Sequence, residues 1–146
     1  MKKFIATLGL ASALLIPNIL NAQQAKGLNV LINSSNPQTQ TMAMVLSMMS
    51  IKKHQKQVNI VLCGKAGDLA DKNIQGTPVK RPNGEAPSPK QNLQMLIKMG
   101  ASVKVCPLYL PNANKDKSIL LDGITVAKPP VVAGNLLNQD FQNITF

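Results

Sequence analysis

Aromatic and acidic residues are scarce in this chain. Its 146 residues include no tryptophan, one tyrosine and three phenylalanines, and six acidic side chains stand against sixteen lysines and arginines. Nucleic-acid binding calls for aromatic stacking platforms or a clustered basic face. Here the basic residues are scattered, with pairs at Lys52-Lys53 and Lys80-Arg81 but no basic tract. We therefore expect no nucleic-acid partner. The lysines either form a solvated basic surface or, in a few cases, attract a small anion toward a site.

Histidines and carboxylates are too few for several common kinds of active site. His54 is the only histidine, so a Ser-His-Asp arrangement would depend on that residue alone. Its place near a helix end, among lysines, favours a solvated side chain. No pair of carboxylates is suited to acid–base catalysis, and no cluster of His, Cys and carboxylate residues indicates a metal site. The sequence thus predicts neither a metal nor a cofactor.

The first 22 residues have the three parts of a secretory signal peptide. Lys2 and Lys3 form a short positive start, residues 4–16 are apolar, and Ala22 supplies a small residue for cleavage. Pro17 interrupts the apolar run before it reaches the about 20 residues that a retained membrane anchor needs. We expect cleavage after Ala22, which takes the formal net charge from +10 to +8 because both lysines leave. The mature protein is then expected in the periplasm, with no membrane partner.

The remaining residues, 23–146, are expected to form one α/β domain that is large enough to bury a core. Near-continuous apolar runs, typical of strands buried on both sides, alternate with segments of helical periodicity. Strands are predicted at 28–32, 58–63, 102–106, 123–127 and 143–146. Helices are predicted at 37–53, 89–99 and 129–137, with shorter helical pieces near 68–72 and 116–121. This alternation indicates a mainly parallel five-stranded sheet with helices on its faces.

The first long helix is apolar beyond a single face, which is more than a surface helix needs. One set of residues follows the i, i+3, i+4, i+7 pattern of a core-facing side: Met42, Val45, Leu46 and Met49. A second set extends the apolar surface: Met44, Met48 and Ile51. We expect the first set to pack on the sheet and the second to contact another subunit, which predicts a homo-oligomer, a trimer or a multiple of it.

Residues 73–89 read NIQGTPVKRPNGEAPSP, with four prolines and two glycines. We expect this segment to lack regular structure. A loop of that length in a compact domain is typically a lid, a binding loop or a disordered excursion. Proteolysis is expected to cut it first, after Lys80 or Arg81.

The carboxyl ends of parallel strands meet at one edge of a sheet, where α/β proteins bind ligands. Candidate residues lie at or next to this edge: Ser34, Ser35, Asn36, Cys63, Lys65, Lys104 and Cys106. The serines and Asn36 precede the first long helix, where they either cap it or hold an anion on hydroxyls and backbone N–H groups. Lys65 either adds positive charge to the same site or is solvated.

Cys106 ends the third strand in VKVCPLYLPN, and three interpretations of it stay open. The first is an inert core thiol. The second is a partly exposed thiolate, favoured by Lys104 on the same strand face, that accepts sulfane sulfur. The third is a bond to Cys63, either as a structural disulfide of an exported protein or as a reversible pair in which Cys63 is the resolving cysteine.

Four stretches carry a further indication, in this order: GLNVLINSSNPQTQTMAM, VNIVLCGKAGDLA, LQMLIKMGASVKVCPLYLP and LLDGITVAKPP. Together they resemble the DsrE-like family of small sulfur-relay proteins over nearly all of the mature chain. The resemblance implies a three-layer α/β/α sandwich that assembles as trimers or hexamers. It also implies that Cys106 matches the cysteine on which some members carry sulfur as a persulfide.

The function expected from the residues and the resemblance is a periplasmic carrier that binds or transfers sulfane sulfur on Cys106. Its partners would be a sulfur donor or acceptor protein, or a small sulfur anion. The alternative is a non-catalytic, oligomeric binding module for a small anion or a protein partner, in which both cysteines are structural.

Overall fold

The computed structural model describes residues 24–146, so the predicted signal peptide lies outside the described residues. Five strands form one sheet in the order β6-β5-β2-β1-β7, and each neighbouring pair is parallel. The strands are β1 (Gly27–Ile32), β2 (Gln57–Leu62), β5 (Ser102–Val105), β6 (Ile124–Val126) and β7 (Phe141–Thr145). All five predicted strands are therefore confirmed, with ends that differ by a residue or two.

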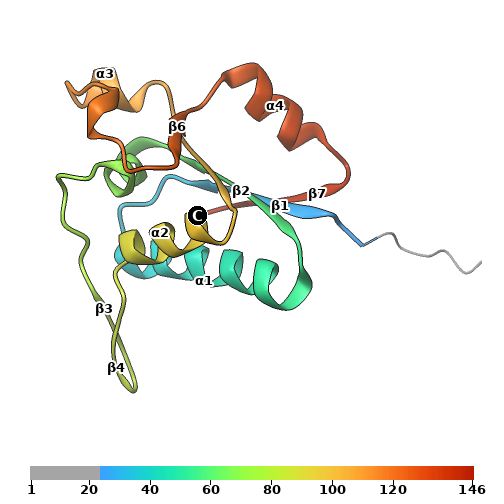
Figure 1. Cartoon of the computed structure of the whole chain (residues 1–146), viewed down its shortest axis with the longest axis horizontal. Helices are drawn as coiled ribbons and strands as arrows, with labels where there is room; N and C mark the ends of the chain where they lie inside the picture. Colours follow the sequence, from blue (N-terminus) through green and yellow to red (C-terminus); the bar gives the residue numbers. More distant parts are fainter. Residues whose placement is uncertain (1–23) are drawn as a thin grey trace, which may run out of the picture.

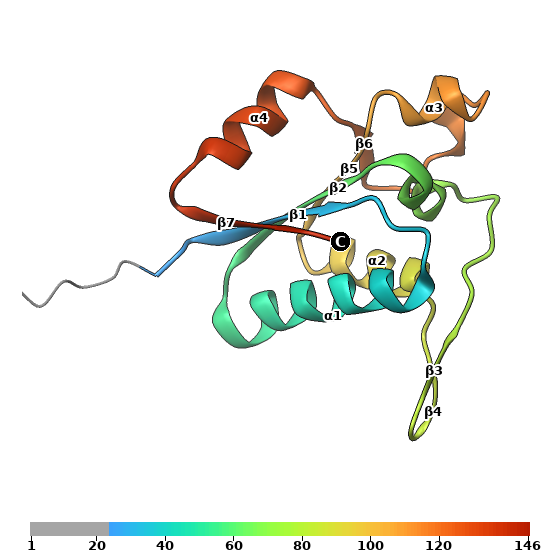
Figure 2. The same cartoon turned by 180° about the vertical axis from the view of Figure 1, so that it is seen from behind.

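Helices lie on both faces of this sheet. On one face run α1 (Pro37–His54) and α2 (Pro89–Lys98), and on the other lies α4 (Pro129–Leu137) (Figures 1 and 2). Three shorter pieces complete the list: the 3₁₀ helices η1 (Gly64–Ala70) and η2 (Lys117–Ile119), and α3 (Tyr109–Asn112). The layers form the predicted α/β/α sandwich. None of the helices among residues 24–146 combines the length and apolar character that a membrane crossing requires.

The ends of α1 and α2 follow from their local sequences. The Asn36 side chain accepts hydrogen bonds from two N–H groups of the first turn of α1. Ser88 begins α2 with a reciprocal capping box in which Gln91 bonds back to the Ser88 N–H. Gly100, with φ of 90°, adopts the left-handed conformation that ends α2. These caps fix where each helix leaves the edge of the sheet.

The core lies between the sheet and the α1–α2 layer. Strand residues with exposures of 0–3% form its sheet side: Val30, Ile32, Val58, Ile60, Leu62, Val103 and Val105. Fully buried residues of α1 and α2 cover them: Ala43, Met44, Leu93 and Leu96. The expected orientation of α1 is wrong, because Met44 and Met48 are buried and Ile51 packs against the core.

The set predicted to lie in the core instead faces outward: Met42, Val45, Leu46 and Met49, with exposures of 36–52%. The physical reason is the pair of small residues beside Met44 and Met48. Ala43 and Ser47 are fully buried, and the Ser47 hydroxyl donates to the Ala43 carbonyl at 2.7 Å, so this side approaches the sheet closely without an unpaired polar group. The outward set gives α1 an exposed apolar face.

The segment 73–89 contains a short hairpin, so the prediction that it lacks regular structure is wrong. Strands β3 (Val79–Arg81) and β4 (Gly84–Ala86) pair antiparallel. The prolines do not interrupt the ladder because Pro82 lies in the turn and the others lie outside both strands. The hairpin extends away from the layers of the sandwich (Figures 1 and 2).

Candidate functional site

The two cysteines lie next to each other at the carboxyl ends of neighbouring strands. Leu62 of β2 pairs with Val105 of β5, and each cysteine is the next residue. The Cys106 N–H donates to the Leu62 carbonyl at 2.8 Å, which continues the ladder past the strand end. Neighbouring parallel strands of a sheet are about 4.8 Å apart. Both thiols are free and half-buried, and they are close enough for Cys106 to affect the pKa of Cys63.

The cysteines form one wall of a pocket of about 560 Å³. The start of η1 contributes Lys65 and Asp68, and the turn into α3 contributes Leu108 and Tyr109. Leu108 is 67% exposed, so an apolar side chain stands at the rim beside Cys106. The pocket thus combines a dithiol, an apolar wall and one pair of opposite charges.

The pKa of the Cys63 thiol is raised above its ordinary value. Burial is the main cause, and the neighbouring Cys106 side chain adds to it; together they raise the pKa of Cys63 to about 11. Cys63 is therefore a neutral thiol at pH 7. In that state it can donate its S–H to the Cys106 sulfur.

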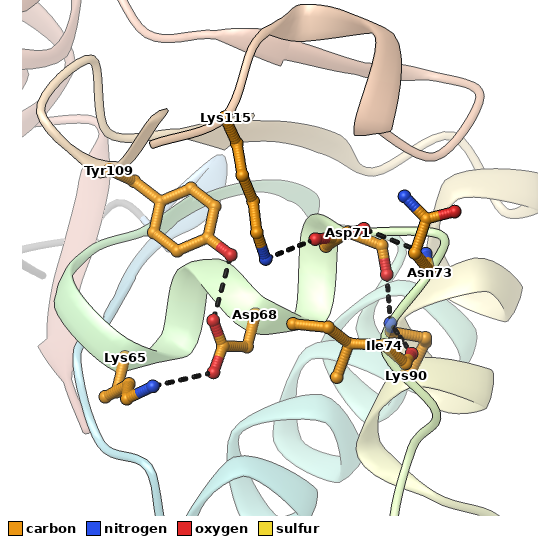
Figure 3. A network of polar contacts seen from close by, with 8 residues as sticks. All are labelled: Lys65, Asp68, Asp71, Asn73, Ile74, Lys90, Tyr109 and Lys115. Carbon is orange, nitrogen blue, oxygen red and sulfur yellow. Dashed lines mark hydrogen bonds and ion pairs between the residues drawn. The ribbon is translucent and has the colours of Figure 1, made fainter. Parts of the chain in front are cut away.

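Tyr109 joins α3 to η1 at the side of the pocket. Its hydroxyl donates to Asp68 Oδ1 at 2.9 Å (Figure 3). Burial and this hydrogen bond raise the pKa of Tyr109. The ring packs on Gly67, where a β-carbon would stand only 2.2 Å from the Tyr109 Cδ2 atom. Glycine at this position therefore permits the ring to lie flat against η1.

A buried ion pair lies behind this wall. Asp71 is buried, and its Oδ2 is 2.6 Å from Lys115 Nζ, while its Oδ1 accepts the Asn73 N–H at 2.8 Å (Figure 3). Lys90, itself buried in α2, donates to the main-chain carbonyls of Asp71 and Ile74. The network fastens the segments that follow η1 and α3 to α2, and so holds the pocket walls in place.

The charges of this network are set by these contacts. Burial alone would raise the pKa of Asp71, but the hydrogen bonds from Lys115 and the Asn73 N–H lower it overall. Burial lowers the pKa of Lys90, against the favourable charge of Asp71. No sequence signal indicates this network, since Asp71 is 19 residues from Lys90 and 44 from Lys115.

Comparison with known proteins adds information on the fold. The sequence matches no protein-family model and no curated protein. Among solved structures, the ychN protein from E. coli is 18% identical with a TM-score of 0.61, over 82% of this chain and 99% of that one. MTH1491 from Methanobacterium thermoautotrophicum, described as a protein of unknown function, is 10% identical with a TM-score of 0.60; the match covers 82% of this chain and 97% of that one. The chain shares the fold of these two proteins. This finding agrees with the DsrE-like resemblance at the level of the fold.

Within this fold, the predicted site residues are partly brought together. Cys63, Cys106 and Lys65 line the same pocket. Lys65 is also paired with Asp68 at 3.3 Å. Lys104 is not among the pocket residues, and its Nζ donates to Ser102 Oγ at 2.7 Å.

The serines and Asn36 lie at the start of α1. Asn36 caps α1, and its N–H donates to Ser34 Oγ at 3.1 Å. The Ser34 N–H is occupied by the Phe146 carbonyl at 3.2 Å. Ser35 lines a second pocket of about 160 Å³ between the starts of α1 and α2, and Lys65 and Asp68 line both pockets.

Proposed function

We propose that the protein is an exported sulfur carrier that takes up sulfane sulfur as a persulfide on Cys106 and passes it to an acceptor. The observation that carries the proposal is the pair of free thiols that line one pocket at the carboxyl edge of the sheet. Half-burial suits a carrier, because the thiol must be reachable by a donor while the persulfide is shielded from other thiols.

The loading step uses Cys106 as nucleophile. Its thiolate attacks the outer sulfur of a persulfide, R–S–SH, and the thiolate RS⁻ leaves, so that Cys106 gains one sulfur. Cys63 supports this role because its pKa of about 11 keeps the proton on Cys63, where the S–H is available to donate to the Cys106 sulfur.

The pocket walls suit both the persulfide on Cys106 and an anionic sulfur donor. A persulfide is a soft, polarisable group, and Leu108 and Ala113 offer it apolar contact. Lys65 is 74% exposed at its side chain, so it can leave Asp68 and meet an anionic donor such as polysulfide.

The exposed position of Leu108 favours a second candidate function, the binding of a protein partner without sulfur chemistry. In that case the pocket receives an apolar side chain of the partner, and the cysteines only line it. This candidate predicts binding that does not depend on the Cys106 sulfur.

Intact mass after brief exposure to inorganic polysulfide separates the two functions. We expect the wild type and Cys63→Ser each to gain one sulfur atom, which dithiothreitol removes, and Cys106→Ser to gain none. Samples are desalted and measured at once at pH 7. Equal loading of Cys106→Ser and wild type would refute the carrier role of Cys106.

A further inference from the structure

We infer that Cys63 resolves the persulfide on Cys106, releasing its outer sulfur as sulfide and leaving a Cys63–Cys106 disulfide. The inference rests on the proposed function and extends it. The same pocket would pass sulfur to an acceptor when one docks, and would reduce it to sulfide when none does.

The placement of Cys63 carries this inference. Both cysteines extend the register of β2 and β5 by one residue, so their α-carbons are separated by about the 4.8 Å spacing of neighbouring strands. Disulfides join α-carbons that are about 4.4–6.8 Å apart. The two thiols line the same pocket and are close enough for Cys106 to raise the pKa of Cys63. A sulfur added to Cys106 therefore lies beside the one other thiol among the described residues.

The chain leaves the sheet at these residues, which allows the sulfurs to approach. Cys63 is followed by Gly64, which has φ of 53° and turns the backbone away from the line of β2. Around Gly64 there is space, since the nearest atom to a β-carbon at this position would be the Asn33 carbonyl oxygen at 3.8 Å. Pro107 likewise ends the extended run after Cys106. Side-chain movement here disturbs no pairing inside the sheet.

The step balances without any further acid or oxidant. The Cys63 thiol and the Cys106 persulfide anion react as R–SH + R′–S–S⁻ → R–S–S–R′ + HS⁻, and the proton of Cys63 leaves with the sulfide. The bond from Cys106 to the outer sulfur breaks, and the bond between the two cysteine sulfurs forms. The outer sulfur leaves with the electron pair of the broken bond, and the Cys63 sulfur supplies the pair of the new bond. A dithiol reductant then restores both thiols by disulfide exchange.

The protonation of Cys63 makes this step slow enough for transfer to compete with it. The thiolate is the reactive form in exchange reactions, and the pKa of about 11 leaves Cys63 protonated near pH 7. An acceptor that reaches the pocket quickly therefore receives the sulfur first. Resolution by Cys63 removes the sulfur that no acceptor takes.

The test follows persulfide lifetime in three proteins: the wild type, Cys63→Ser and Cys63→Ala. Each is reduced, loaded with inorganic polysulfide, desalted, and kept without oxygen or reductant at pH 7. We expect the wild type to release one sulfide per loaded chain and to end as an intrachain disulfide. Both variants should keep their sulfur at least about tenfold longer. Circular dichroism checks that the variants are folded, and two substitutions guard against an effect of either one on folding.

Two results overturn the inference in distinguishable ways. Loading of all three proteins with equal lifetimes would remove the role of Cys63 and leave the carrier function intact. Failure of all three to load would remove the carrier function itself, and the inference with it.

Discussion

Lys115→Met should destabilise the protein far more than Lys65→Met, although both lysines pair with aspartates in or directly after η1 (Figure 3). The Lys115 Nζ lies 2.6 Å from the carboxylate of Asp71, whose side chain is 1% exposed. The Lys65 Nζ lies 3.3 Å from Asp68, and these two side chains are 74% and 32% exposed. Methionine keeps much of the apolar stem and removes the charge, so the comparison isolates the pairing.

The magnitudes follow from burial. At an effective dielectric constant of about 20, unit charges at the 2.6 Å separation of Lys115 and Asp71 attract each other by about 6 kcal/mol. Much of this attraction offsets the desolvation of the carboxylate. Removing one partner of a buried pair costs about 3–5 kcal/mol. Asp71 would keep the Asn73 N–H and the nearby charge of Lys90. We therefore expect the lower end, about 3 kcal/mol, for Lys115→Met, and about 0–1 kcal/mol for the exposed pair.

The effect should also depend on pH with a definite sign. The folded-state pKa of Asp71 is lowered, so its carboxylate contributes stability above its unfolded pKa of about 3.9. That contribution is lost as the pH falls through the folded pKa. The difference in stability between wild type and Lys115→Met should therefore shrink as the solution is acidified below about pH 4.

Urea unfolding, followed by far-UV circular dichroism at a fixed protein concentration, measures both effects. Circular dichroism is the suitable signal because the chain has no tryptophan, and a fixed concentration removes any contribution from assembly. A loss below about 1 kcal/mol for Lys115→Met would refute the reasoning from burial. So would equal losses for the two variants.

Three further predictions concern packing, assembly and the hairpin. Gly67→Ala places a methyl group 2.2 Å from the Tyr109 ring and should lower the free energy of unfolding by about 1–3 kcal/mol. Gly134→Ala in α4, where a β-carbon would meet no atom within 4 Å, should raise the free energy of unfolding by about 0.5–1 kcal/mol. Urea midpoints check this pair, and equal shifts would contradict it. We expect the wild type to sediment as a homo-oligomer and Leu46→Glu, on the exposed apolar face of α1, to sediment as a monomer; a monomeric wild type at micromolar concentration would exclude assembly through that face. Limited trypsin digestion should cut first after Lys80 in the protruding hairpin, and first cleavage elsewhere would mean that the hairpin is protected.

Structural features that depend only on residues close together in the sequence were predictable. The strands are continuous apolar runs bounded by polar residues and glycine, and such runs need no tertiary information to be found. Asn36 and Ser88 are capping residues followed directly by proline, which locates the starts of α1 and α2. The alternation of these elements then indicates the α/β class and the edge that holds the cysteines.

The orientation of α1 was not predictable from periodicity, because apolar residues occupy most of its circumference. Two sets fit a helical repeat, and the buried set is chosen by the small residues Ala43 and Ser47, which allow close contact with the sheet. A buried serine argues against a core face when the sequence is read alone. Its hydroxyl is satisfied by the Ala43 carbonyl, which only the structure reveals.

The remaining features depend on which segments meet in space. The adjacency of the cysteines requires β2 and β5 to be neighbours, and the sequence predicts both strands without their order. The hairpin consists of two three-residue strands, too short to show an alternating pattern among prolines. Lys90 is buried because main-chain carbonyls of a distant segment accept its hydrogen bonds. A lone lysine at the start of a helix gives no sign of that environment.

The most direct test of the central claim is the intact mass of folded Cys63→Ser after loading with polysulfide, measured before and after reductant. This variant cannot resolve a persulfide within the chain, so any sulfur taken up by Cys106 stays in place. We predict a gain of one sulfur atom that maps to the peptide containing Cys106 and disappears on reduction. An unchanged mass after loading, with the protein shown to be folded, would contradict the claim that Cys106 carries sulfur.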